Sequence, residues 1–152
     1  MAKKMKVLVS DKLSDEGVKI MQDAGLEVDC KYKLSVDELK GIIGNYDAIA
    51  IRSGTNLTMD IIEKADGLKM IGRAGVGVDN VDVEAATKKG IIVMNAPGGN
   101  TISTCEQAWA LLLAAARNTA FAHASMKEGK WDRAKFKGVE LYSKTLGVIG
   151  FG

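Results

Sequence analysis

Five short apolar runs recur along the chain at nearly constant intervals, and this spacing constrains the fold more than any other feature. The runs begin at residues 6, 26, 47, 69 and 91. A leucine-rich solenoid can have a similar period, but no L-x-x-L-x-L-x-x-N motif is repeated here. The spacing therefore indicates successive βα units. The predicted strands are Lys6–Val9, Leu26–Asp29, Asp47–Ile51, Lys69–Ile71 and Ile91–Met94.

Helix-capping residues stand in the intervals between these runs. Ser35 is followed three residues later by Glu38, which is the spacing of a capping box. The run Ile91–Met94 has no polar alternation, as is typical of a parallel strand covered on both faces. The pattern predicts an α/β fold, a doubly wound parallel five-stranded sheet with helices on both faces. The expected N-caps are Ser14, Ser35, Thr58 and Asp82, the third of them for a helix over Met59–Ala65.

The composition is that of an ordinary globular domain and excludes several classes of protein. The chain has 152 residues, 47% hydrophobic and 26% charged, so it is long enough to bury a core without disulfides or a structural metal. Two cysteines and one histidine provide neither a disulfide framework nor a zinc-ligand pattern. The 21 basic and 19 acidic residues are interspersed, so no nucleic-acid partner is expected.

No segment has the length and apolar character of a membrane-spanning helix. The longest apolar run, Trp109–Ala116, is far shorter than the ~20 residues that a bilayer requires. Near the N-terminus, Val7–Val9 is too short for the apolar region of a signal peptide. We therefore expect a cytoplasmic protein without a membrane partner.

The pattern changes after Pro97-Gly98-Gly99. A helix from about Asn100 to Asn118 is apolar almost all round, and we expect Trp109 within it to be buried. A helix of this kind has to be covered on every side, which predicts a second domain or a second subunit. The polar and basic segment from Ala120 to Lys144 is expected to form an extended arm.

The end of the sequence has the pattern of a strand, Thr145–Ile149, followed by Gly150 and Gly152. These glycines have the spacing of the first two in a G-x-G-x-x-G motif, which forms a tight turn into a helix that holds a pyrophosphate. Because the motif is incomplete, we expect the chain to be the N-terminal part of a longer protein. The alternative is that this strand joins the edge of the first sheet in a complete small protein.

Ligands of doubly wound sheets bind beyond the carboxyl ends of the strands, so the residues after each strand are candidates for a site. Arg52 and Arg73 stand in two of these segments, and glycines accompany both. Guanidinium groups pair with carboxylates or phosphates, and glycine lets a ligand approach the backbone. The segments are Ser10–Asp11, Arg52–Gly54, Gly72–Gly77 and Asn95–Asn100.

Each of these residues also has a purely structural interpretation. Arg52 and Arg73 could be salt-bridged surface residues, and the glycines could only permit turns. Asn100 is a suitable N-cap for the long helix. Asp11 could be the phospho-acceptor of a receiver domain, but Arg52 stands where such a domain needs an aspartate.

Five segments resemble the D-isomer-specific 2-hydroxyacid dehydrogenases. They are Arg52–Thr55, Gly72–Asp82, Val93–Asn100, Gly129–Arg133 and Leu146–Gly152. The resemblance runs the whole chain and implies a flavodoxin-like substrate-binding domain over residues 1–98. Residues 99–152 would hold an interdomain helix, a dimer arm and the first strand of a truncated Rossmann NAD-binding domain. Among members of the family, those acting on a phosphorylated 2-hydroxy acid are the most similar.

The resemblance also implies roles for individual residues. Its substrate-binding positions, which face a carboxylate and a phosphate, are matched by Arg52, Ser53, Arg73, Gly75, Asn100 and Arg133. Its NAD-binding positions are matched by Val76, Gly150 and Gly152. Arg133 would belong to the arm that packs on a partner subunit, so a homodimer or a higher homo-oligomer is expected.

The catalytic histidine, its paired carboxylate and the catalytic arginine of the family lie downstream of the glycine motif. We therefore expect this chain alone to hold no catalytic residue, to bind no metal and to be inactive as an oxidoreductase. Two alternatives remain open. One is a reductase of the same family that acts on a non-phosphorylated 2-oxo acid, and the other is a stand-alone binding or regulatory module.

Overall fold

The structure is a computed structural model that describes residues 4–150, which divide after Asn100 into two compact units. Gly152, one of the expected cofactor-binding residues, lies outside the described residues. Within the described part of the chain, no helix is both long enough and apolar enough to cross a membrane.

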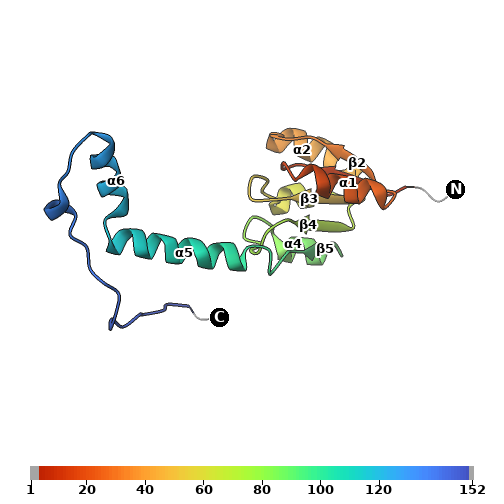
Figure 1. Ribbon diagram of the computed structural model, residues 1–152. Coiled ribbons are helices and arrows are strands. Elements are labelled where there is room, and N and C mark those ends of the chain that lie inside the picture. Colours follow the sequence, from red (N-terminus) through yellow and green to blue (C-terminus); the bar gives the residue numbers. More distant parts are fainter. Residues whose placement is uncertain (1–3, 151–152) are drawn as a thin grey trace. The chain divides into compact units, whose positions relative to one another are not determined.

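The first unit is built on a parallel sheet of five strands in the order β2-β1-β3-β4-β5; Figure 1 labels β2, β3, β4 and β5 of this sheet. The expected α/β fold with a parallel five-stranded sheet is thereby confirmed. Strand β4 continues past the predicted end and includes Arg73, which pairs in register with Ile51 of β3. The strands are β1 (Lys6–Val9), β2 (Glu27–Cys30), β3 (Ala48–Ile51), β4 (Met70–Arg73) and β5 (Ile92–Met94).

Helices connect these strands as the capping pattern predicts, with one exception. The side chains of Ser14, Ser35 and Asp82 accept hydrogen bonds from backbone amides in the first turns of their helices, and Ser35 with Glu38 completes the capping box. Thr58 precedes its helix but makes no capping bond, because its hydroxyl donates to the Asp60 carboxylate instead. The helices are α1 (Asp15–Asp23), α2 (Val36–Ile42), η1 (Ile43–Asn45), α3 (Met59–Ile62) and α4 (Val83–Lys88).

One apolar core lies between the sheet and helices α2, α3 and α4. Leu8, Ile49 and Ile71 extend from the three central strands and are at most 1% exposed. Ile61 and Ile62 cover them from α3. Right-handed crossovers in this strand order place α1 on the opposite face of the sheet. The core therefore fixes the strands whose carboxyl ends carry the candidate site.

The second unit differs from the sequence-based expectations in two places. Residues 119–127 form helix α6 (Thr119–Lys127) where an extended arm is predicted; alanine is the best helix former, and this segment is rich in it. A short 3-10 helix, η2 (Arg133–Phe136), follows. The segment 145–149 forms no strand, and Ile149 is fully exposed. The predicted strand over Thr145–Ile149 is therefore not observed.

The predicted long helix is present as α5 (Thr101–Ala116), and none of its residues is buried. The expected burial of Trp109 is not observed, since this side chain is 49% exposed. The sheet of the first unit contains no strand from residues 145–149 either. The alternative in which this strand joins the edge of the first sheet is therefore not observed among the described residues.

Candidate functional site

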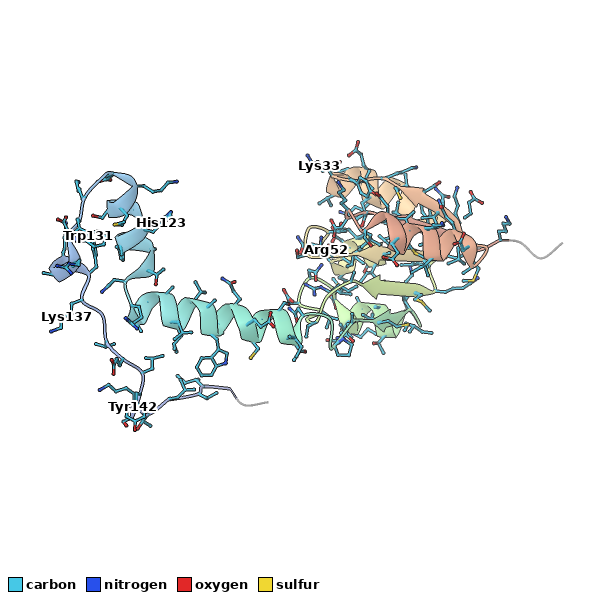
Figure 2. The ribbon with its side chains drawn as sticks, viewed as in Figure 1. Lys33, Arg52, His123, Trp131, Lys137 and Tyr142 are labelled. Carbon is cyan, nitrogen blue, oxygen red and sulfur yellow. The ribbon has the colours of Figure 1, made fainter. Side chains whose placement is uncertain are left out.

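The carboxyl edge of the sheet collects the loops that follow β1, β3, β4 and β5, because parallel strands all end on the same side. The strand order reverses between β1 and β3, and such a switch point is where doubly wound sheets bind ligands. In Figure 2 the labelled Arg52 lies at this end of the first unit. The candidate site is the set of residues that these loops bring together.

Asp11, after β1, holds the loop that follows β3. Its Oδ2 atom accepts hydrogen bonds from the backbone amides of Arg52 at 2.6 Å and Thr55 at 3.0 Å. The buried hydroxyl of Ser10 lies 2.9 Å from that of Thr55. These bonds use one Asp11 oxygen to fix the loop, so the structure gives Asp11 a supporting role. It gives no support to the interpretation of Asp11 as a phospho-acceptor.

Asn80 ties the same loop to Arg73 on β4. The Oδ1 atom of Asn80 accepts a hydrogen bond from Arg73 Nε at 2.9 Å. Its Nδ2 group donates to the carbonyl oxygens of Arg52 and Thr55, at 2.7 Å and 2.6 Å. One side-chain amide therefore links both arginine-bearing segments.

The glycine-rich segment after β4 lies against Arg73 and against the loop after β5. A Cβ atom added to Gly75 would lie 2.1 Å from Nη1 of Arg73, so this glycine leaves space for the guanidinium group. The carbonyl oxygen of Gly75 accepts from the Ala96 amide at 2.9 Å, and that of Val76 accepts from Asn95 Nδ2 at 2.6 Å. The segment is thus fixed from both sides.

Neither arginine of this edge is used in an ion pair within residues 4–150, so the interpretation as salt-bridged surface residues is not supported. Arg52 is exposed, and its Nη1 reaches only the Lys12 carbonyl at 3.5 Å. Arg73 is half-buried and keeps its terminal nitrogens after Nε is bonded to Asn80. Two guanidinium groups without carboxylate partners can bind a carboxylate or a phosphate bidentately.

The strongest pKa shift in the first unit lies away from this edge. Contact with the Lys40 ammonium, and then with the Thr58 hydroxyl, lowers the pKa of Asp60 to about 2. Both Asp60 and Thr58 stand at the start of α3. This shift belongs to the helix terminus and contributes nothing to the candidate site.

The structure brings some of the expected site residues together and leaves others apart. Arg52, Ser53, Arg73, Gly75 and the 39% exposed Val76 come from adjoining loops of the carboxyl edge. The remaining described ones lie elsewhere in the chain: Asn100 is exposed at the end of the first unit, and Arg133 and Gly150 belong to the second unit.

Within the second unit, Arg133 is placed by a neighbouring aromatic ring. Its guanidinium carbon lies 5.8 Å from the centre of the Trp131 ring, a cation–π contact. His123, in α6, is exposed. Among the described residues no cluster of histidine, cysteine, aspartate or glutamate is arranged to hold a metal ion.

Sequence reasoning missed the supporting residues. Asn80 stands within the Gly72–Asp82 segment but was given no role, and Asp11 was considered only as a phospho-acceptor. The usable signal was that both polar side chains follow β1 and β4, the strands on either side of β3, which delivers Arg52. Short polar side chains at such positions commonly bond to neighbouring backbone groups.

Comparison with known proteins gives consistent relationships. Residues 7–140 match the sequence profile described as "D-isomer specific 2-hydroxyacid dehydrogenase, catalytic domain". The D-3-phosphoglycerate dehydrogenase of Methanocaldococcus jannaschii is 56% identical over 97% of this chain, and that of Archaeoglobus fulgidus is 55% identical over 97%. The chain spans 28% of the length of each of these two relatives.

A solved structure agrees with the sequence matches. The cofactor(NAD+)-bound 3-phosphoglycerate dehydrogenase of Entamoeba histolytica is 29% identical, and the match covers 91% of this chain and 44% of that one with a TM-score of 0.72. The arrangement of loops at the carboxyl edge, the profile match and these relatives lead to one assignment. The chain belongs to the family of D-isomer specific 2-hydroxyacid dehydrogenases.

Proposed function

We propose that this chain is the N-terminal portion of an NAD-dependent D-3-phosphoglycerate dehydrogenase, which oxidises 3-phosphoglycerate to 3-phosphohydroxypyruvate. The observation that carries the proposal is the pair of guanidinium groups, Arg52 and Arg73, that meet no carboxylate partner at the carboxyl edge of the sheet. A substrate with a carboxylate at one end and a phosphate at the other needs cationic groups of this kind. The names of the 55–56% identical relatives support the same substrate.

In this proposal the residues of the chain bind and orient the substrate. Arg52 and the Ser53 hydroxyl contact one anionic end, while Arg73 and the backbone of Gly75 contact the other. Asn100 borders the cleft at the start of the long helix. Holding both ends fixes the carbon that carries the hydroxyl group. Such positioning lowers the barrier to the reaction, because the entropy of orienting the substrate is lost on binding and not in the chemical step.

The cofactor of the proposed enzyme is NAD, whose chemistry when bound is the acceptance of a hydride. Val76 is exposed at the carboxyl edge, where it would contact the nicotinamide end. Gly150 has a φ of +84°, a left-handed conformation that suits the tight turn of a dinucleotide-binding motif. In this proposal both residues would border the cofactor. The helix that would hold the pyrophosphate is not among the described residues, and neither are the expected catalytic groups.

The proposed arrangement assigns residues 1–98 to a substrate-binding domain. Residues 99–152 would supply the interdomain helix, the dimer arm and the beginning of the NAD-binding domain. The exposed apolar residues of α5, which include Trp109, Leu111 and Leu113, support a homo-oligomer that covers them. Arg133 would then reach the partner's substrate site from the arm. A cytoplasmic location is part of the same proposal.

The test is a steady-state assay of the full-length protein that contains this chain, with 3-phosphoglycerate and NAD. Replacing Arg52 or Arg73 by lysine keeps the charge but removes bidentate binding, and should raise KM by roughly tenfold or more. Arg117→Lys, on an arginine outside the site, is the matched control and should change KM little.

Three outcomes would contradict the proposal. A clear preference for a non-phosphorylated 2-oxo acid would favour another reductase of the family. Absence of turnover together with a well-behaved monomer would favour a stand-alone binding module. Turnover by residues 1–152 alone would overturn the expectation that the catalytic groups lie outside this chain.

A further inference from the structure

The side chain of Asn80 is the point at which three segments of the carboxyl edge meet. It is half-buried and comes from the loop between β4 and α4. Its bonds reach Arg73 at the end of β4, and Arg52 and Thr55 in the loop after β3. All the donated hydrogens of the amide, and its oxygen, are therefore engaged within the site.

Asn80 contacts the side chain of Arg73 but the main chain of Arg52, and this difference matters for binding. Arg73 is contacted through Nε, the inner nitrogen of its guanidinium group, so this bond leaves the two terminal nitrogens available to a ligand. Arg52 is contacted through its main-chain oxygen, which fixes the origin of its side chain but leaves the side chain exposed. Asn80 thus sets the orientation of the Arg73 guanidinium group and the position of the Arg52 backbone.

Asp11 completes this arrangement from the other side of the loop. It accepts from the amides of Arg52 and Thr55, and Asn80 donates to the carbonyl oxygens of the same two residues. The loop is held by both its donors and its acceptors. Hydrogen bonds of this kind define a geometry more sharply than apolar packing does.

We propose that Asn80 is a positioning residue for the anion site: by one side-chain amide it fixes Arg73 and the Arg52 loop in the relative arrangement that binds the substrate's two anionic ends. This inference rests on the proposed function, because it acts through the two arginines. In this role Asn80 acts on the substrate only through the two arginines that it contacts. Loss of the Asn80 side chain is therefore expected to displace the two arginines and so to weaken substrate binding.

The expected changes follow from the chemistry of each replacement. Asn80→Ala removes all three bonds. Asn80→Asp keeps an acceptor for Arg73 Nε but sets carboxylate oxygens against the carbonyl oxygens of Arg52 and Thr55, where the amide donated at 2.7 Å and 2.6 Å. Asn80→Asp should therefore also displace the loop. Both variants should raise KM for 3-phosphoglycerate about tenfold or more, with a smaller effect on KM for NAD.

The deciding experiment is a double-mutant cycle in the full-length enzyme with Asn80→Ala, Arg73→Ala and the pair. If Asn80 acts through Arg73, the alanine at position 80 should raise KM far less in the Arg73→Ala background than in the parent. Independent factors that multiply would overturn the inference. Asn45→Ala, on an exposed asparagine of η1 far from the site in sequence, serves as the control and should leave KM unchanged.

Folding and the proposed function are checked separately. Thermal unfolding should show that Asn80→Asp or Asn80→Ala still melts cooperatively; if neither does, Asn80 is a stability residue and the inference is wrong. If Arg52→Lys and Arg73→Lys leave KM unchanged, the proposed function fails. If those two raise KM and the Asn80 variants do not, only the inference fails.

Discussion

The carboxylate of Asp11 and the backbone of Gly54 approach each other so closely that no side chain fits between them. A Cβ atom added to Gly54 would lie 2.6 Å from Oδ1 of Asp11. The other oxygen of the same carboxylate binds the amides of Arg52 and Thr55. Glycine at position 54 is therefore a requirement of the bonds that hold this loop.

Gly54→Ala should displace the Asp11 carboxylate and lower the free energy of unfolding by about 1–3 kcal/mol. The measurement is urea denaturation followed by circular dichroism. The control is Gly41→Ala in α2, where no atom lies within 4 Å of the added Cβ and alanine favours the helix. Equal stability of the two variants would contradict the steric explanation.

Gly75→Ala should affect binding more than stability. The added methyl group would meet Nη1 of Arg73, which is the end of a flexible side chain and can move away. The guanidinium group would then leave its binding position, and KM for 3-phosphoglycerate in the full-length enzyme should rise roughly tenfold. Gly41→Ala in α2, with open space around its Cβ and outside the site, is the control. A large loss of stability with unchanged KM would show that the backbone, and not Arg73, gives way.

Ser35 and Thr58 occupy the same position before their helices and should respond differently to alanine. Ser35 is part of a capping box, with the Glu38 amide 3.3 Å from its hydroxyl and its own amide 2.8 Å from the Glu38 carboxylate. Ser35→Ala should lower the free energy of unfolding by about 1 kcal/mol. Thr58 makes no capping bond, so Thr58→Ala should have a smaller effect. Denaturant unfolding of both variants makes the comparison. An equal loss of unfolding free energy in the two would contradict the assignment of a cap to Ser35 alone.

The start of α3 should contribute to acid sensitivity through Asp60. Contact with Lys40, and then with Thr58, lowers its pKa from 3.8 to about 2. Because the folded state binds this proton more weakly than the unfolded state, the contribution to stability is present above about pH 4. It is lost as the pH falls toward 2. A carbon-13 titration of the Asp60 carboxyl should show the low pKa in the parent, and a return toward 3.8 in Lys40→Gln. An unchanged pKa in that variant would exclude Lys40 as the main cause.

Local signals in the sequence predicted most of the first unit. The strands are short apolar runs and three of the four expected caps form, because both depend on residues close in the chain. Thr58 failed as a cap because Asp60 offered its hydroxyl a competing acceptor. The prediction of an extended arm is wrong at residues 119–127, because the charges that follow Lys127 dominate the composition of the whole segment from Ala120 to Lys144. Residues 145–149 form no strand, because an extended segment becomes a strand only when it pairs with a neighbouring strand.

The candidate site was predicted only as far as its arginines. Residue type and position after a strand identified Arg52 and Arg73 without any knowledge of their contacts. Asn80 reaches Arg52 across 28 positions of the chain and Arg73 across 7, so its role exists only once β3 and β4 are side by side. Position after a strand next to β3 points to the loop after β4, but the choice of Asn80 among the polar residues of that loop needs the contacts themselves.

Helix α5 has a practical consequence for anyone who prepares this chain in isolation. Ile102, Trp109, Leu111 and Leu113 are each at least 49% open to solvent, on a helix of sixteen residues with none buried. Such a surface should bind hydrophobic dyes, adhere to column matrices and promote self-association as the concentration rises. A mild detergent should therefore improve the yield of dispersed protein.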